Sequence, residues 1–317
     1  MKPIRFGIIG AGHIAHTFCN AVQLVDDAEV IAVASKTPGK SQTFAEANNL
    51  PHWYDNYEAM LSLEDIDVVY IATTHNFHFE NAMLCIAHHK AILCEKCFVL
   101  TEQEARTVFA AAKQEGLFVM EAMWSRFLPA IQKAKSWIQE GAIGDLELAH
   151  NIIGFKADED PKGRILNPHL AGGAMYDIGV YAIELMTYLV DQEIQEIQSM
   201  VTRAHTDVDK VDNISIRFES CIANLQAAIS IYCGTELKIY GTKGYIVIPN
   251  AHYASECMLY NQYEQVEHFV APTTNGFRYQ VQEVVDCLRN GQLESSIMPH
   301  DATIQCAAIF DQCLGTK

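Results

Sequence analysis

An apolar segment that runs directly into a glycine-rich turn constrains this chain more than any other feature. Residues 4–9 are largely apolar, two glycines follow, and residues 14–25 have a helical pattern. Glycines permit a tight turn and close backbone approach, and the free N–H groups at the start of a helix attract phosphate. The G-x-G-x-x-A pattern that ends at Ala15 therefore predicts a dinucleotide-binding turn, with a turn that binds nothing as the alternative. The predicted cofactor contacts in this turn are Gly10, Gly12, His13 and Ile14.

Strand-like and helix-like segments alternate as far as about residue 122. The expected strands are residues 4–9, 29–34, 53–54, 68–73, 91–94 and 117–121. Nearly continuous apolar strands separated by helices are typical of a parallel sheet that is buried on both faces. Residues 1–122 are therefore predicted to form a doubly wound Rossmann domain within an α/β protein.

The pattern changes in the remainder of the chain. A helix is expected at residues 174–189, and strands follow with almost no helices between them, at 197–204, 213–218, 223–232, 237–240, 245–248 and 264–269. The sequence Thr242-Lys243-Gly244 fits a hairpin turn. Consecutive strands predict an α+β domain at residues 123–317 with a large, open, mostly antiparallel sheet. Its last helix is expected to pack back on the first domain.

Composition excludes several classes of function. The 317 residues carry a net charge of −17, which argues against nucleic acid or an anionic membrane as the main partner. No apolar run is long enough to span a bilayer, and the N-terminal residues lack the apolar region of a signal peptide. The ten cysteines are scattered through apolar runs. Buried thiols of this kind suit a reducing, cytoplasmic location better than a disulfide framework.

The end of the second expected strand bears on the choice of cofactor. Sites for NAD usually carry a carboxylate here to bind the ribose hydroxyls, whereas this chain has Ser35 and Lys36. A hydroxyl and a cation would hold the 2′-phosphate of NADP, so NADP is the expected cofactor and NAD is the alternative. A solvated loop lysine is the competing interpretation.

Polar residues follow two further strands of the first domain. The sequence Cys94-Glu95-Lys96-Cys97 ends one strand, and ligands bind outside the carboxyl ends of parallel strands, so Glu95 and Lys96 are expected to face a crevice. A redox or metal pair of cysteines is a weaker alternative, because a second ligand pair is missing. Further cofactor contacts are expected after the preceding strand, at Thr73, His75 and His78. We expect the two histidines to line the crevice edge rather than bind a metal.

Taken together, these segments resemble the glucose–fructose oxidoreductase/inositol dehydrogenase/MocA family. The resemblance rests on G-I-I-G-A-G-H-I-A, on C-E-K-C-F at residues 94–98, and on A-G-G-A-M-Y-D-I-G-V-Y at residues 171–181. The sequence M-E-A-M-W-S-R-F-L-P at residues 120–129 is similar to the branch that contains dimeric dihydrodiol dehydrogenase and the NADP-dependent xylose dehydrogenases. The order and spacing of these segments agree over nearly the whole chain.

The resemblance implies roles for single residues and a catalytic cleft between the two domains. Lys96 matches a lysine that contacts substrate and nicotinamide ribose, and Asp177 and Tyr181 match the acidic residue and the tyrosine of the D-x-G-x-Y sequence. The residues expected to bind substrate are Trp124, Arg126, Phe155 and Asp177, together with Arg164 in a loop over the site. Relatives pair subunits through the open sheet, so a homodimer is expected as well.

The chemistry of these residues is consistent with the implied roles. Asp177 and Tyr181 are four residues apart on an expected helix and so share one face. A tyrosine, with an ordinary pKa of about 10, is a poor base at neutral pH, and a lysine cation nearby lowers that pKa. Lys96 with Tyr181 is therefore a sensible catalytic pair for accepting the proton of an alcohol. Asp177 is expected to assist, by orienting this pair or by bonding a substrate hydroxyl. The competing interpretation is that Tyr181 only packs a helix.

One position departs from the family pattern. Proline usually follows the lysine, often after a cis peptide bond, whereas this chain has Cys97. A cis bond before any other residue costs about 2.5–4 kcal/mol. This cost alone favours a trans bond between Lys96 and Cys97.

These observations predict an NAD(P)-dependent oxidoreductase. It would move a hydride between the nicotinamide and a CH–OH or C=O carbon of a sugar, polyol or cyclic diol, with no metal. The alternative is a non-catalytic NADP-binding regulator of the same fold, for which Cys97 is the only support.

Overall fold

The computed structural model describes residues 2–315, and these form two compact units. One unit holds the chain up to Trp124 together with Asn275–Ile304, and the other holds Ser125–Thr274 together with the chain from Gln305 on. The sequence-based boundary after residue 122 lies two residues before the observed one, and the first unit also takes residues 275–304 from the C-terminal part of the chain.

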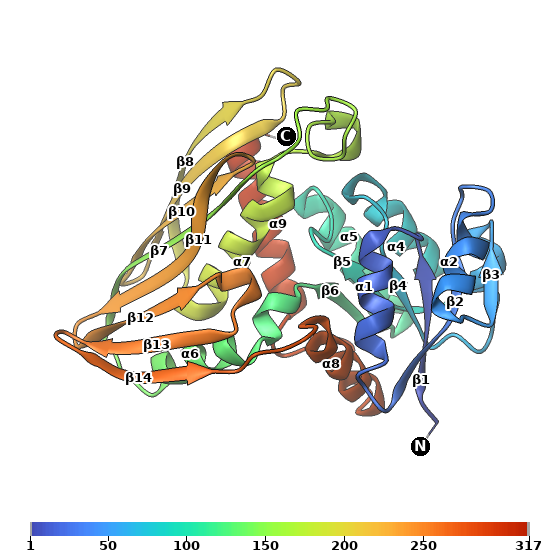
Figure 1. The fold of residues 1–317 in the computed structure, drawn as a ribbon, viewed down its shortest axis with the longest axis horizontal. Coiled ribbons are helices and arrows are strands. Elements are labelled where there is room, and N and C mark those ends of the chain that lie inside the picture. Colours follow the sequence, from blue (N-terminus) through green and yellow to red (C-terminus); the bar gives the residue numbers. More distant parts are fainter. Residues whose placement is uncertain (1, 316–317) are drawn as a thin grey trace. The chain divides into compact units, whose positions relative to one another are not determined.

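The first unit contains a six-stranded sheet with helices on both of its faces (Figure 1). Its strands lie in the order β3-β2-β1-β4-β5-β6, and every neighbouring pair is parallel. The strands are β1 (Ile4–Ile9), β2 (Ala28–Ala34), β3 (His52–Tyr54), β4 (Val68–Ile71), β5 (Ala91–Glu95) and β6 (Val119–Ala122). The helices of this unit include α1 (His13–Val22), α2 (Lys40–Asn48), α3 (Tyr57–Leu61), α4 (His78–Ala87), α5 (Glu102–Glu115) and α8 (Phe277–Arg289).

Burial explains why this sheet forms from these residues. Every residue of β4 and of β5 is buried, which requires cover on both faces of the strands. The strand order is that of a dinucleotide-binding Rossmann fold, which reverses direction between β1 and β4. The doubly wound parallel sheet predicted from the sequence is therefore confirmed.

The second unit is organised by an eight-stranded sheet (Figure 1). Its order is β14-β13-β12-β11-β7-β10-β9-β8, and all pairs are antiparallel except β7 with β10. The strands are β7 (Leu146–Lys156), β8 (Ile194–Arg203), β9 (Asp209–Phe218), β10 (Ile222–Ala228), β11 (Ser230–Gly241), β12 (Gly244–Pro249), β13 (Glu256–Asn261) and β14 (Gln265–Val270). The mostly antiparallel sheet is therefore confirmed, as is the hairpin turn at 242–244 that joins β11 to β12.

Helices cover one face of this sheet. Helix α6 (Pro129–Gln139) packs on β12, β13 and β14, and helix α7 (Val180–Val190) packs on β7 and β10. Side chains of β11 alternate accordingly, with Leu237 and Ile239 buried and Lys238 and Tyr240 partly exposed. The helix α9 (His300–Leu314) closes the chain.

Three elements differ from expectation. The expected strand at residues 223–232 is two strands, because the chain crosses from one side of β7 to the other around Ile229. Strand β13 was not expected, since its C-M-L-Y run lacks the alternation of a half-buried strand. The expected helix at 174–189 begins as a π-helix at Met175–Gly179 before it continues as α7.

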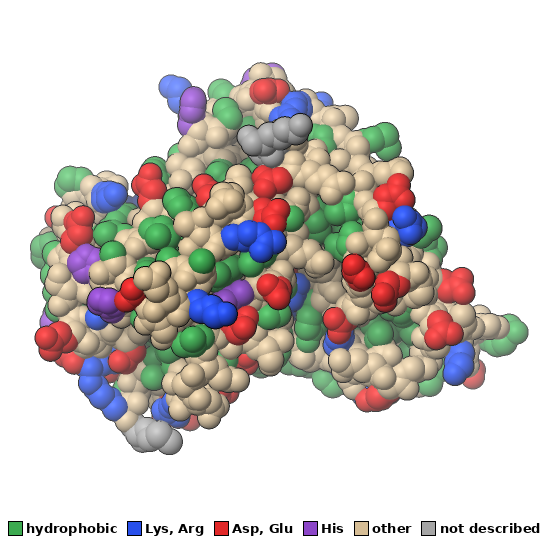
Figure 2. Space-filling model, turned by 180° about the vertical axis from the view of Figure 1, so that it is seen from behind, with side chains coloured by type: hydrophobic (Ala, Val, Ile, Leu, Met, Phe, Trp, Pro, Cys, Tyr) green, Lys and Arg blue, Asp and Glu red, His purple; other side chains and the backbone are tan. Residues whose placement is uncertain are grey.

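The surface carries charge of both signs. Figure 2 shows acidic side chains distributed over one face of the molecule, with lysines and arginines interspersed among them. Among residues 2–315, no helix is both long and apolar enough to cross a membrane.

Candidate active site

The glycine turn after β1 requires its first glycine. Gly10 has a φ of +101°, and a Cβ there would lie 2.8 Å from the carbonyl oxygen of Ala72. Its N–H donates a hydrogen bond to the Ala34 carbonyl at 2.9 Å. Gly10 is thus wedged between the ends of β2 and β4, at the edge where Rossmann folds bind their cofactor.

The second glycine leaves room for a ligand. Gly12 precedes helix α1, whose first turn has no acidic residue and no side-chain cap. Within residues 2–315, no atom outside the turn lies within 4 Å of where a Cβ on Gly12 would be. Uncapped N–H groups beside open space are what a pyrophosphate needs, so the turn fits a dinucleotide cofactor, with His13 and Ile14 opening the helix.

Ser35 and Lys36 lie together at the end of β2. The Ser35 side chain is buried and its hydroxyl oxygen accepts a hydrogen bond from the Thr37 N–H at 3.3 Å. The Lys36 ammonium lies 4.8 Å from the centre of the Tyr57 ring. Burial raises the pKa of Tyr57, so this ring stays neutral under the ammonium. A cation on a rigid aromatic support suits an anionic group on the adenosine ribose.

Lys96 follows β5 directly, and its peptide bond to Cys97 is cis. The expected trans bond is therefore wrong. The expectation considered only the free energy of an isolated cis peptide bond. In the folded chain, the buried side chains of His78 and Glu121 contact the backbone of Cys97 and Phe98, on the C-terminal side of this bond. The Cys97 carbonyl lies 2.8 Å from Nδ1 of His78, and the Phe98 N–H donates to the Glu121 carboxylate at 3.0 Å.

His78 is a buried link rather than a residue at an open edge. It is fully buried, and its second ring nitrogen lies 3.0 Å from the Thr73 carbonyl, so the ring joins the end of β4 to Cys97. Burial is the main reason why the pKa of His78 is lowered, and the lowered pKa keeps the ring neutral. Thr73 also accepts a hydrogen bond from Asn81, and His75 is buried beside His78 with ring centres 5.8 Å apart.

Glu95 is also buried, with its carboxylate held inside the first unit. Tyr70 donates a hydrogen bond of 2.5 Å to Oε1 of Glu95. Burial raises the pKa of Glu95 to about 7, although the Tyr70 hydroxyl and the Lys96 charge act in the opposite direction. The expected direct contact of Glu95 with cofactor stays a prediction. The hydrogen bond from Tyr70 holds the Glu95 side chain in place, directly before Lys96 in the chain.

Cys94 and Cys97 are both free thiols and both fully buried. Burial raises the pKa of Cys94 well above its ordinary value, which disfavours the thiolate needed for redox or metal chemistry. Within residues 2–315, no three His, Cys, Asp or Glu side chains are grouped so that they could hold a metal ion.

In the second unit, the π-helix presents Asp177. Arg164, from the loop before this helix, donates a hydrogen bond of 2.7 Å to Oδ1 of Asp177. The Asp177 side chain is 9% exposed and the Arg164 side chain 46%. The pair therefore joins a nearly buried carboxylate to a guanidinium that reaches solvent.

Tyr181 lies one turn after Asp177, in the first turn of α7. Its ring packs beside His252, with centres 5.2 Å apart, and the residue is 7% exposed. Phe155, near the end of β7, is partly exposed in the same unit. Asp177 and Tyr181 thus lie on successive helical turns, and Arg164 reaches Asp177 from the preceding loop.

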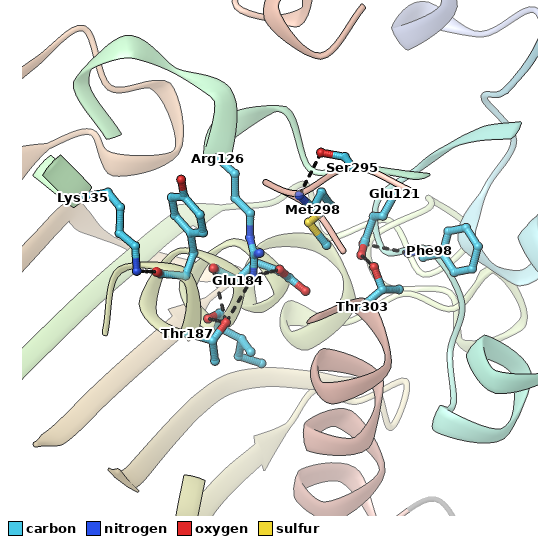
Figure 3. Close-up of polar contacts among 11 residues, drawn as sticks. Phe98, Glu121, Arg126, Lys135, Glu184, Thr187, Ser295, Met298 and Thr303 are labelled. Atoms are coloured by element: carbon cyan, nitrogen blue, oxygen red, sulfur yellow. Dashed lines mark hydrogen bonds and ion pairs between the residues drawn. The ribbon is translucent and has the colours of Figure 1, made fainter. Parts of the chain in front are cut away.

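Arg126 and Trp124 are more buried than a substrate contact implies. The Arg126 guanidinium pairs with the Glu184 carboxylate at 2.5 Å and donates to Thr187 at 3.3 Å, with both charged side chains almost fully buried (Figure 3). Trp124 is 3% exposed and packs on Phe277. Burial raises the pKa of Glu184, and the Arg126 charge opposes that shift.

Sequence reasoning missed Glu121. Its carboxylate accepts hydrogen bonds from the Phe98 N–H and from the Thr303 hydroxyl at 2.9 Å, and it is 2% exposed (Figure 3). A carboxylate inside the otherwise apolar strand β6 was the signal available, because buried charges are rare unless they have partners.

Comparison with known proteins identifies the class. Residues 4–123 match the model of the GFO/IDH/MocA oxidoreductase family with its NAD-binding Rossmann fold, and residues 131–247 match the GFO/IDH/MocA C-terminal domain. The chain belongs to this family and is an NAD(P)-dependent oxidoreductase. The expected family and cofactor class are thereby confirmed.

Similar proteins were found by sequence and by structure. The chain is 31% identical to trans-1,2-dihydrobenzene-1,2-diol dehydrogenase of Mus musculus over 98% of this chain and 95% of that protein. The structure of aldose-aldose oxidoreductase from Caulobacter crescentus, complexed with glycerol, shares the fold with a TM-score of 0.90 at 24% identity, covering 98% of this chain and 96% of that one. KijD10, a 3-ketoreductase from Actinomadura kijaniata in complex with NADP and TDP-benzene, has a TM-score of 0.88 at 22% identity, covering 98% and 97%.

Proposed function

We propose that this oxidoreductase transfers a hydride between the nicotinamide and a CH–OH or C=O carbon of a sugar, polyol or cyclic diol. The observation that carries the proposal is the arrangement of Tyr181 one turn after Asp177, within a chain of this family. The relatives support the substrate class, because their names describe a dihydrodiol dehydrogenase, an aldose oxidoreductase and a ketoreductase.

Tyr181 exchanges the proton of the reacting hydroxyl. When bound, the nicotinamide cofactor supplies or accepts the hydride. A phenol with an ordinary pKa of about 10 needs a nearby cation to act as a base at neutral pH, and Lys96 is the residue to which we assign that task. Lys96 follows a strand end that His78 and Glu121 hold in place.

Asp177 orients the substrate in this proposal. Its pair with Arg164 leaves part of the guanidinium exposed, which suits a contact with substrate hydroxyls. Phe155 supplies an apolar surface from β7. Arg126 and Trp124 are buried with partners of their own, so in this proposal they shape the surroundings and do not bind substrate directly.

We assign a preference for NADP to Ser35 and Lys36. The support is a buried hydroxyl and a ring-supported ammonium at the end of β2, where NAD sites usually place a carboxylate. The cofactor contacts proposed along the strand ends are Gly10, Gly12, His13, Ile14, Thr73, His75, Glu95 and Lys96. His78, which is fully buried against two backbone carbonyls, is proposed to support this edge from the inside.

The outer face of the eight-stranded sheet is proposed to pair two subunits. The register places Leu148, Tyr240, Tyr245 and Tyr260 in one row across four strands. Leu148 is 44% exposed, and the rings of Tyr245 and Tyr260 stack with centres 4.6 Å apart. A surface row of tyrosines is typical of the core of a protein interface. Light scattering should show a dimer, and a monomer at micromolar concentration would refute this part.

A cytoplasmic location is part of the same proposal. All ten cysteines are free thiols, as expected in a reducing compartment.

A substrate screen tests the reaction. Purified protein is mixed with NADP⁺ or NAD⁺ and a panel of aldoses, polyols and cyclic diols, and reduced nicotinamide is followed by absorbance. Turnover of at least one compound, lost in Lys96→Met, is expected. A Lys96→Met protein with full turnover would overturn the mechanism. Cofactor binding without turnover of any compound would favour the alternative, a non-catalytic regulator.

A further inference from the structure

The π-helix that carries Asp177 is capped by a residue far along the chain. The side chain of Ala174, at the start of this helix, offers no hydrogen bond to the N–H groups of the first turn. Instead, the Met175 N–H donates a hydrogen bond of 2.6 Å to Oδ2 of Asp209, at the start of β9. A free N–H in the first turn of a helix needs such an acceptor when it is buried.

The Asp209 carboxylate also fits tightly against the glycines before the helix. A Cβ on Gly173 would lie 2.1 Å from Oδ1 of Asp209, and Gly173 has a φ of +124°. On the other side of this backbone, the Gly173 N–H donates to the Ile165 carbonyl at 2.9 Å. The entry to the π-helix is therefore held between the Asp209 carboxylate and the segment that bears Arg164.

A second carboxyl group accompanies the first. Asp212 lies three residues further along β9 and is fully buried, and Asp209 is 3% exposed. Burial, followed by the charge of Asp209, raises the pKa of Asp212 to about 9. Asp212 is therefore neutral at neutral pH, so it places no second negative charge beside Asp209, which accepts the hydrogen bond from Met175.

Among residues 2–315, two other groups interact with this pair. Arg203, on the neighbouring strand β8, pairs in register with Asp209 and lowers the pKa of Asp212. The Cys313 thiol of α9 interacts with Asp212, and burial is the main cause that raises the pKa of this thiol. On the π-helix, the carboxylate of Asp177 is bound by Arg164. The raised pKa of Asp212 therefore avoids two negative charges on neighbouring buried carboxyl groups.

We propose that Asp209 is a positioning residue that fixes the entry of the π-helix and thereby the orientation of Asp177 and Tyr181. The proposal rests on the function proposed above for its catalytic consequence. The geometry assigns Asp209 no contact with substrate or cofactor.

Four variants of the full-length protein test this role. Asp209→Ala removes the acceptor, and Asp209→Asn keeps an oxygen that can accept from Met175. Asp212→Asn replaces the second carboxyl group with an uncharged amide of nearly the same size. The control is Asp207→Asn, in the same turn, with a side chain 89% exposed and a φ of +68° that asparagine tolerates.

Amide hydrogen exchange gives a readout that does not need a substrate. In Asp209→Ala, the amides of residues 175–181 are expected to exchange about tenfold faster or more, because a hydrogen bond to a charged acceptor is lost. Asp209→Asn should restore most of the protection, and Asp207→Asn should equal the wild type. Unchanged exchange in Asp209→Ala would overturn the proposal. If Asp209→Ala does not fold, amide exchange of residues 175–181 is measured in Asp209→Asn and Asp212→Asn instead. Both variants are expected to exchange slowly, and fast exchange in both would contradict the role assigned to Asp209.

Kinetics and pH then separate positioning from general stability. With an identified substrate, Asp209→Ala is expected to lower kcat by about 100-fold while the dissociation constant of NADP stays within about twofold. The Tm of the wild type should fall relative to that of Asp212→Asn as the pH rises towards 9, since only the wild type must keep a proton on Asp212. Equal pH dependence of the two Tm values would refute a neutral Asp212. If the wild type turns over no substrate at all, the proposed function fails, and the exchange data still decide whether Asp209 holds the helix.

Discussion

Arg164 and Asp177 form a 2.7 Å hydrogen bond that ties a loop residue to the π-helix in front of Tyr181. The carboxylate is 9% exposed and the guanidinium 46%, so one partner is fixed while the other can still reach a ligand. This asymmetry makes Arg164 the easier of the two to change without loss of the fold.

Arg164→Met is expected to raise KM for the substrate by about tenfold, because one charge-assisted hydrogen bond to a substrate hydroxyl is lost. Binding of NADP should not change, and Arg164→Lys should recover part of the loss. Initial-rate kinetics with calorimetric titration of the cofactor measure both quantities. An Arg164→Met protein with wild-type KM would remove Arg164 from the substrate site.

Tyr181→Phe is expected to lower kcat by about 10²–10⁴-fold, since the group that exchanges the hydroxyl proton is absent. The phenyl ring keeps its packing beside His252, so Tm should shift little. Tyr253→Phe, which alters an exposed ring next to the same histidine, is the control. Retention of more than about half of kcat in Tyr181→Phe would exclude Tyr181 as the proton-exchanging residue.

Lys36→Ala is expected to weaken NADP binding by about tenfold and to leave NAD binding nearly unchanged. Only NADP carries a 2′-phosphate for the ammonium above the Tyr57 ring. Lys40→Ala, at the start of helix α2, is the matched control. Fluorescence titration with both cofactors gives the ratio, and an equal effect on the two would show that Lys36 does not select NADP.

Glu95 makes the stability of the first unit depend on pH. Its pKa is raised by burial from 4.5 to about 7, so the stability that this carboxyl contributes is fully present below about pH 4.5. That contribution is lost as the pH rises through about 7, because the folded chain must then hold a buried charge. Glu95→Gln should therefore gain on the order of 3 kcal/mol relative to the wild type between these pH values. Chemical unfolding of both proteins at about pH 5 and about pH 8 without cofactor measures this gain, and a stability difference that is the same at both pH values would contradict it.

Arg126→Met is expected to destabilise the second unit by about 3–5 kcal/mol, because Glu184 is left as a buried charge without its cation. The double variant Arg126→Met with Glu184→Leu should recover most of this loss, since apolar side chains can replace a buried pair. Urea unfolding of both proteins tests the order. If the double variant is no more stable than the single one, the pair is not the reason for the loss.

Local patterns allowed much of this fold to be predicted. The Gly10–Gly12 turn, the alternation of strands and helices, and the hairpin at 242–244 each depend on neighbouring residues, and each is present. The spacing of Asp177 and Tyr181 also led to a correct helix. It could not reveal the π-helix, because a separation of four residues returns a side chain to nearly the same face in both kinds of helix.

The features that were missed or misplaced depend on contacts across the chain. The ion pair of Arg126 with Glu184 is such a contact, and only the fold shows it; whether Arg126 also binds substrate stays a prediction. The cis bond before Cys97 likewise depends on a neighbourhood that includes His78 and Glu121. No local pattern contains that information, so cost alone gave the wrong isomer.

The single parallel pair of the second sheet has a further consequence. An antiparallel neighbour of β7 could have been reached through a turn of a few residues, as β12 is reached from β11. Because β10 runs parallel to β7, the chain must leave the end of β7 and travel back before it can pair again. The connection from β7 to β10, residues 157–221, carries Arg164, Asp177, Tyr181 and Asp209. One parallel pair in this sheet thus requires a long connection, and that connection carries the residues to which we assign the proposed chemistry.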